Sequence, residues 1–135
     1  MGLAFEEAAA RNVGLTAARV WTPPLPRWWG DAEQHILHTA ECETAERTML
    51  QTALHGWTDK HPDVPVNVDL MAGDTGPALA LLARDAQLVV VGSHRHSDLR
   101  RQPGSVSRHL LQYATCPVAL VREVASLNAT PPTVR

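Results

Sequence analysis

Apolar positions recur along the chain with two periods, one typical of β-strands and the other of amphipathic helices. Four segments rich in β-branched and aliphatic residues have the character of strands: residues 15–21, 64–72, 87–93 and 117–123. The third is apolar at every position from Leu88 to Val91. Such a run predicts a strand of a parallel sheet with Val89, Val90 and Val91 buried on both faces.

Segments with apolar positions every three or four residues alternate with these strands and predict helices at residues 3–12, 31–57, 77–86 and 105–114. Gly14 follows the first of them and is the kind of residue that ends a helix. The second predicts a long amphipathic helix with one solvated face. In the last, Val106, Leu110, Leu111 and Ala114 share an apolar face.

Strands that alternate with helices in this way indicate parallel βαβ units with right-handed crossovers. The predicted fold class is therefore α/β, doubly wound, with a mostly parallel sheet and helices on both faces. One domain is expected over residues 1–123, and residues 124–135 form a loose tail because their sequence has no usable period. Ligands of such folds bind beyond the carboxyl ends of the strands, where the segment from Gly92 to Ser107 lies.

Composition narrows the class of partner. The 135 residues are 44% hydrophobic and 19% charged with a formal net charge of -2, which suits one globular core. Without a basic excess, a general nucleic-acid or membrane-surface binder is not expected, so any anionic partner should be small. Two cysteines are too few for a disulfide framework, and no apolar run approaches the roughly 20 residues of a bilayer span. A cytoplasmic setting is expected.

The segment after the third strand carries the most specific chemistry. Gly92 ends the strand, and Gly104 stands immediately before a helix whose first N–H groups point outward at the positive end of the helix dipole. Phosphate fits this site, with the amides of Ser105 to Ser107 and the two serine hydroxyls as donors. Arg95, Arg100 and Arg101 would be its charge partners. Alternatively, Ser105 only caps the helix.

This segment, with "ATCPVALVRE" after it, resembles the universal stress protein family, whose nucleotide-binding members carry G-x2-G-x9-G-[ST] between the fourth strand and fourth helix. The resemblance extends upstream through "FEEAAARNVGLTAARVWTPP" and "GDTGPALALLARDAQLVVVGS". It implies a Rossmann-like, five-stranded parallel sheet of order 3-2-1-4-5, often a dimer through its last strand. In some members it implies bound ATP.

By match of position, Gly92 is the first glycine of the motif, Gly104 its last and Ser105 the following hydroxyl, while Val20 stands where the family's second strand lies near adenine. An ATP or AMP site is therefore expected at Val20, Gly92, Ser93, His94, Arg95, Gly104, Ser105, Val106 and Ser107. No catalytic residue and no metal ligand is assigned.

Two features depart from the family pattern. Arg95 replaces the second motif glycine, and eight residues rather than nine separate it from Gly104. The family's first strand, with the Asp at its carboxyl end, has no counterpart in this sequence. Because that strand is central in the sheet, its loss is expected to leave a row of backbone groups unpaired unless another segment or another chain covers them.

Three function hypotheses follow: a nucleotide-binding stress-response regulator, a non-nucleotide dimerisation or partner-binding module, and a slow nucleotide hydrolase. A homodimer through Pro117–Glu123 is expected because this strand is an apolar edge in the family order. Ala119→Pro is expected to remove one N–H group from that edge.

Other side chains suggest weaker alternatives, each with a simpler structural explanation. His94 and His96 could bind a metal or lie exposed, and His35 and His38 could share a helix face. Trp28 and Trp29 could stack on a ring or cover the core. Ser105 as a nucleophile would need His109 as its base, and Asp98 is better explained as a solvated charge.

Overall fold

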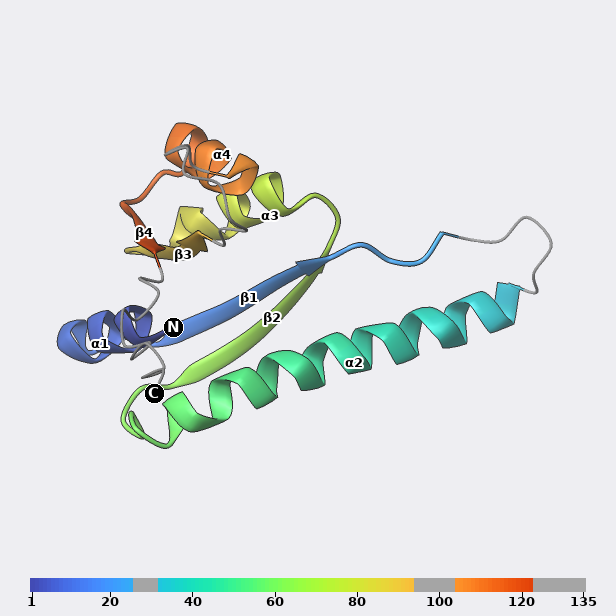
Figure 1. Cartoon of the computed structure of the whole chain (residues 1–135), viewed down its shortest axis with the longest axis horizontal. Helices are drawn as coiled ribbons and strands as arrows, with labels where there is room; N and C mark the ends of the chain where they lie inside the picture. The colour runs from blue at the N-terminus through green and yellow to red at the C-terminus, as the bar shows by residue number, and fades with distance from the viewer. Residues whose placement is uncertain (26–31, 94–103, 123–135) are drawn as a thin grey trace, which may run out of the picture.

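The computed structural model describes residues 1–25, 32–93 and 104–122, in which helices and strands alternate (Figure 1). In chain order the elements are α1 (Gly2–Arg11), β1 (Leu15–Trp21), α2 (Ala32–Thr58), β2 (Val66–Ala72), α3 (Thr75–Leu82), the 3-10 helix η1 (Ala83–Asp85), β3 (Val89–Ser93), α4 (Ser105–Tyr113) and β4 (Val118–Arg122). The α/β class is confirmed, and all four strands lie within the predicted segments. The predicted tail at 124–135 lies outside the described residues.

The four strands form two parallel pairs. In the first pair Leu15 of β1 lies opposite Val66 of β2, and in the second Val89 of β3 lies opposite Val118 of β4. Among the described residues, no strand joins β1 to β3. In Figure 1, β1 lies between β2 and the β3–β4 pair. The break therefore falls where the family order would place its first strand.

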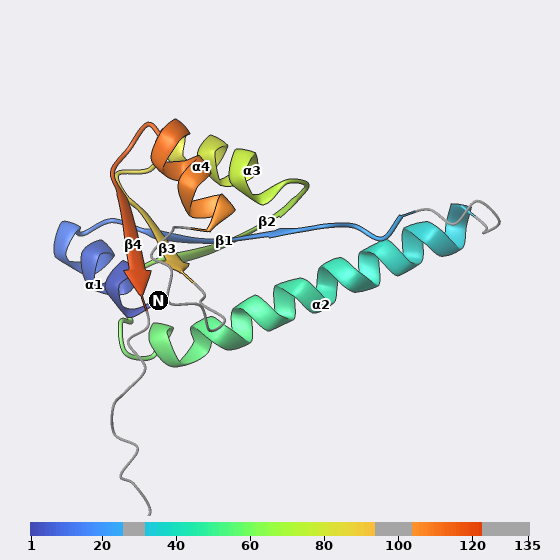
Figure 2. The same ribbon diagram turned by 45° about the horizontal axis from the view of Figure 1, so that its top comes forward.

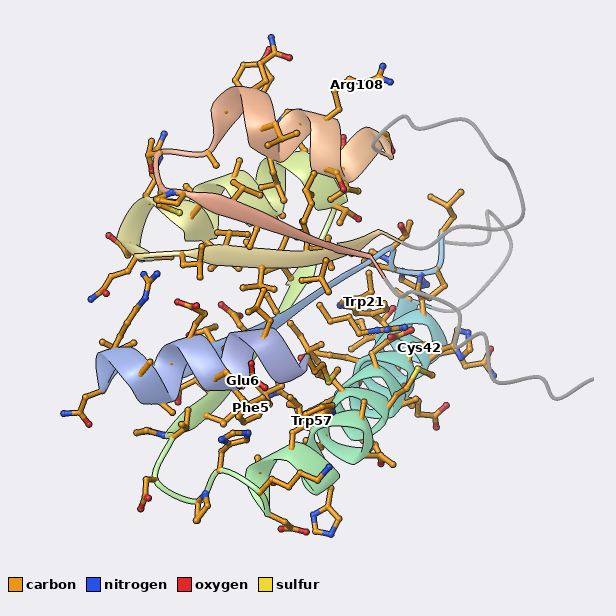
Figure 3. The ribbon with its side chains drawn as sticks, turned by 60° about the vertical axis from the view of Figure 1, so that its left-hand side comes forward. Phe5, Glu6, Trp21, Cys42, Trp57 and Arg108 are labelled. Carbon is orange, nitrogen blue, oxygen red and sulfur yellow. The ribbon has the colours of Figure 1, made fainter. Side chains whose placement is uncertain are left out.

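The main hydrophobic core lies between α1, α2 and the β1–β2 pair. It consists of Phe5, Ala8, Leu50, Leu54 and Val64, with apolar side chains of both strands packed around them. The Phe5 ring stacks on Trp57, at 6.3 Å between ring centroids (Figure 3), and it also stacks on His61, at 5.5 Å. Aromatic burial of this kind fixes α1 to the carboxyl-terminal end of α2.

A second packed region joins α3, η1 and α4. Leu110 of α4 and Ala83 of η1 are both fully buried. Ser107, one helical turn before Leu110, is buried as well. Leu111, expected on the same apolar face, is 54% exposed, so that part of the prediction was wrong. The helix turns by about 100° per residue, which carries Leu111 out of the face that Leu110 buries.

The prediction that Val89, Val90 and Val91 are buried on both faces was also wrong, because all three are only half-buried. In the described part of the chain, β3 has a neighbouring strand on one side only. A strand at the edge of a two-stranded sheet keeps part of its side-chain and backbone surface exposed.

Helix α2 extends beyond the sheet. Its carboxyl-terminal part buries Leu50 and Leu54, whereas Ile36 and Leu37 near its start are 67% and 59% exposed. Figures 1 and 2 show the amino-terminal half projecting away from the rest of the molecule. The long helix was predicted correctly, and its two buried residues, Leu50 and Leu54, both lie in its last three turns.

Helix α1 ends differently from the prediction. Its cap is Asn12, in the left-handed conformation with φ 54° and ψ 47°, and the cap N–H bonds to the carbonyls of Ala8 and Ala9. Asparagine tolerates this conformation better than most residues, so Gly14 is not needed to end the helix.

Of the helices in the described ranges, none combines the length and the apolar run that a membrane span requires.

Candidate functional site

The candidate site centres on the amino terminus of α4. Gly104 is the N-cap, with an extended backbone at φ -60° and ψ 168°, and its carbonyl accepts from the Arg108 N–H at 2.9 Å. The N–H groups of Ser105, Val106 and Ser107 precede this bond, so they have no acceptor within the helix. The first turn carries no acidic residue. These three donors and the helix dipole favour an anion at this position.

The two glycines of the motif leave open space. A Cβ built on Gly92 or on Gly104 would meet no described atom within 4 Å, and neither residue has a positive φ. Their backbone conformations are therefore open to any residue, and described neighbours do not demand glycine there.

The two serines of the segment differ in exposure. Ser105 is exposed at the first position of α4, whereas the Ser107 side chain is only 5% exposed. The N-cap is Gly104, so the alternative that Ser105 merely caps the helix is not borne out. Of the two predicted hydroxyl donors, Ser105 faces solvent, and Ser107 offers chiefly its backbone N–H.

The strand ends complete the described part of the site. Figure 3 shows the carboxyl ends of β3 and β4 and the first turn of α4 on one side of the molecule, with Trp21, the last residue of β1, labelled on that side too. Val20 precedes Trp21 and is half-buried. The β-strands therefore bring Val20 and Gly92 toward the same end of the fold as Ser105.

Several predicted residues cannot be placed. His94, Arg95, His96, Asp98, Arg100 and Arg101 lie outside the described residues, as do Trp28 and Trp29. The Ser93 backbone ends β3. The charge partners expected for a phosphate therefore remain predictions from the sequence.

His109 packs against α3 and its own helix. A Cβ on Gly76 of α3 would lie 2.9 Å from His109 Cγ, and the imidazole centroid is 4.5 Å from that of Tyr113. The ring thus has a packing role between α3 and α4. No described contact joins it to Ser105 as a base.

The histidines of α2 form no metal centre. His35 is half-buried, and His38 lies beside Cys42 instead, with Nε2 3.9 Å from Sγ. Within the described ranges, no group of three or more His, Cys, Asp or Glu residues could hold a metal ion. The four-residue spacing of His38 and Cys42 on a helix could have revealed this pair from the sequence.

One ion pair had no signal in the sequence. The Arg19 Nε of β1 bonds to a carboxylate oxygen of Glu46 on α2, 27 residues later.

A hollow lies at the amino end of β1 and so away from the candidate site. Its lining includes Ala8, Asn12, Gly14, Asp63 and Pro65.

Comparisons with known proteins point to one family over most of the sequence. Residues 2–122 match the model of the universal stress protein family. A universal stress protein of Mycobacterium bovis is 35% identical over 121 residues, which cover 89% of this chain and 38% of that protein. One of Mycolicibacterium smegmatis is 36% identical over 125 residues, covering 88% and 39%. The chain thus spans less than half the length of these curated relatives.

Solved structures of the same family share the fold. Universal stress protein UspA from Lactobacillus plantarum has a TM-score of 0.65 at 19% identity, covering 89% of this chain and 85% of that one. A family protein from Arabidopsis thaliana with AMP bound has a TM-score of 0.56 at 16% identity, covering 96% and 81%. At these identities the likeness concerns the fold alone.

Proposed function

The chain belongs to the universal stress protein family, and from this premise we propose that it is a stress-response regulator that binds ATP or AMP between Gly92 and Ser107. The observation that carries the proposal is that Gly104, where an added Cβ would meet no described atom within 4 Å, directly precedes the three N–H groups of Ser105, Val106 and Ser107. A phosphate in this space accepts from these donors at the positive end of the helix dipole.

The exposure of Ser105 supports the same proposal. Its hydroxyl is accessible at the first position of α4, where it adds a side-chain donor to the backbone donors. The Arg95, Arg100 and Arg101 guanidinium groups supply positive charge from the adjoining sequence. A phosphate ligand would explain why three arginines gather in this segment of a chain whose formal net charge is -2.

The nucleoside end of the site is proposed at β1. Val20 offers a half-buried apolar side chain near the carboxyl end of this strand, and an adenine ring needs such a surface. The AMP bound to the Arabidopsis protein supports an adenine nucleotide as the ligand class.

Isothermal titration calorimetry with ATP and with AMP tests the proposal. Gly104→Ala places a methyl group in the proposed phosphate space and should lower nucleotide affinity at least about tenfold, the equivalent of one charge-assisted hydrogen bond. Gly56→Ala on α2 is the matched control, since a Cβ there also meets nothing within 4 Å. Absence of heat with either nucleotide in the unmodified chain would exclude the proposal.

The proposed assembly is a homodimer through β4. This strand pairs with β3 along one edge, and within the described residues no second strand lies along the other. The side chains of Val118, Ala119, Leu120 and Val121 are only half-buried. A second copy would supply the missing backbone bonds and cover this apolar surface.

A further inference from the structure

The amino-terminal half of α2 has two sides that differ in exposure. Four residues spaced four, three and four apart are half-buried: His35, Thr39, Cys42 and Glu46. They mark the side that faces the β1–β2 pair, since Glu46 bonds to Arg19 of β1. Figures 1 and 2 show this half of the helix projecting from the molecule, and its opposite side is exposed.

An apolar strip lies on this exposed side and consists of Leu37, Ala40 and Thr44. All three residues are exposed, Leu37 to 59%, and Ile36 beside them is 67% exposed. The Thr44 hydroxyl donates to the Ala40 carbonyl at 2.9 Å, so its polar group is satisfied and its methyl group is left for contact. Spacings of three and four residues are those of the core positions a and d of paired helices. The strip therefore has the pattern of a seam that binds a second helix.

Negative charge flanks the apolar strip. When Leu37 is taken as position a of a heptad, Glu41 and Glu43 occupy e and g, the two positions beside the seam. Residues 32–46 contain four glutamates and neither lysine nor arginine. Among the described residues Glu41 forms no ion pair, and Glu43 reaches only Arg47, at 3.7 Å. Both flanks of the strip therefore favour a cationic neighbour.

The same charges decide which kind of helix can cover the strip. If two copies paired antiparallel about Leu37, Glu33 of each copy would lie opposite Glu41 of the other. Parallel pairing would bring glutamates at e and g together, and like charges at these positions disfavour pairing. A helix with lysine or arginine at its own e and g positions meets both flanks with opposite charge. The pattern thus favours a basic partner over a second copy.

We propose that the apolar strip of α2 docks a basic amphipathic helix of another protein. The small side chains of Ala40 and Thr44 leave room for larger apolar residues of that helix to approach the α2 backbone, and Leu37 supplies the central apolar contact. Lysine or arginine on the partner then lies beside Glu41 and Glu43. Because these ion pairs are exposed, binding weakens as salt is added.

The docking proposal is independent of nucleotide binding and of the proposed homodimer. It uses the exposed side of α2, whereas those proposals use the first turn of α4 and the outer edge of β4. Failure of either of them leaves the helix-docking strip standing, and the reverse is equally true.

Fluorescence anisotropy with labelled synthetic peptides provides the test. The probe has three heptads with leucine at a and d, lysine at e and g, and alanine or glutamine elsewhere. One control peptide carries glutamate in place of every lysine, and a second has the composition of the probe in a scrambled order. The lysine peptide should bind at least about tenfold more tightly than either control, and its affinity should fall with added salt.

Substitutions on α2 locate the contact. Leu37→Ser removes the central apolar side chain and should weaken lysine-peptide binding at least about fivefold. Met49→Ser is its matched control, because Met49 is also exposed, at 55%, but lies about 120° around the helix from Leu37. It should leave the affinity unchanged.

A charge exchange tests the flank of the strip. Glu41→Lys should weaken binding of the lysine peptide and strengthen binding of the glutamate peptide, each about threefold or more. Because Glu41 is exposed, this variant should keep its fold, and circular dichroism checks that it does.

Four results would overturn the proposal: no binding of the lysine peptide at millimolar concentration, equal binding of the scrambled peptide, equal losses in Leu37→Ser and Met49→Ser, or affinities unchanged by Glu41→Lys. Self-association of the unmodified chain that Leu37→Ser abolishes in sedimentation velocity would assign the strip to a second copy and so exclude the partner helix.

Discussion

Gly76 in the first turn of α3 lies directly against the imidazole of His109 in α4, so that a Cβ at this position would sit 2.9 Å from the ring's Cγ and 3.1 Å from its Cβ. Gly76 is buried, and its φ is not positive. Glycine is therefore required there by the close approach of the two helices rather than by backbone conformation.

Gly76→Ala should lower the free energy of unfolding by about 1–3 kcal/mol, because the added methyl group forces His109 or a helix to move. Urea denaturation followed by circular dichroism measures the change. Gly56→Ala is the control: its Cβ meets no atom within 4 Å, and alanine in a helix is favoured over glycine by about 0.5–1 kcal/mol. Equal midpoints for Gly76→Ala and the unmodified chain would contradict this contact.

Leu110 and Leu111 should respond oppositely to truncation although they are adjacent. Leu110→Ala removes a fully buried side chain and should cost about 2–5 kcal/mol of unfolding free energy. Leu111→Ala should change it by less than about 0.5 kcal/mol, since Leu111 is 54% exposed. A comparable loss in both variants, in the same urea experiment, would place Leu111 in a buried interface.

The hydrogen bonds between β3 and β4 show which substitution in β4 tests the proposed dimer. Because the Val89 N–H donates to Pro117, the N–H of Ala119 points toward β3 and that of Leu120 toward the outer edge. The expectation that Ala119→Pro removes an outer-edge donor was therefore wrong. A proline at Ala119 breaks the β3–β4 pair.

Leu120→Pro should weaken the homodimer about tenfold, because both copies lose an interface hydrogen bond worth about 0.5–1.5 kcal/mol. Sedimentation velocity over a concentration series measures the dissociation constant. Ala119→Pro serves as the comparison and should lower the unfolding free energy instead. An unchanged dissociation constant for Leu120→Pro would show that the copies meet elsewhere.

Arg95→Gly should raise nucleotide affinity about tenfold or more. The family motif has glycine at this position, and the spacing to Gly104 is one residue shorter, which leaves less room for an arginine side chain beside the ligand. Calorimetry with ATP measures the change, with Arg84→Gly on η1 as an exposed control. Loss of affinity would instead identify Arg95 as a phosphate contact worth about 1.5–3 kcal/mol.

The sequence predicted the strands well because their signal is local. The runs around Val68, Val90 and Leu120 are each rich in β-branched or aliphatic residues, and all three lie in strands of the structure. Sheet membership is not local, so half-burial of Val90 depends on which strand lies beside it. The ion pair of Arg19 and Glu46, which lie 27 residues apart, could not be predicted either, because it also depends on how distant segments pack.

At the candidate site, the sequence predicted glycines and serines but not their individual surroundings. Spacing placed Gly104 before a helix, and the structure makes it the N-cap. No sequence pattern shows that Ser107 turns inward while Ser105 stays exposed, since this depends on how α4 rotates against α3. The Gly76 contact with His109, which sets that rotation, joins residues 33 positions apart.

Helix α2 has a further consequence for the thermal behaviour of the chain. In its amino-terminal half, Thr39 and Thr44 each donate a hydroxyl bond to the carbonyl four residues earlier, so these side chains satisfy their own helix. Its amino-terminal half is thus held mainly by bonds within itself, and an isolated helix of fewer than about 12–15 residues is only marginally stable in water. This half should unwind gradually on heating, residue by residue from Ala32, well before the cooperative melting of the core around Leu54.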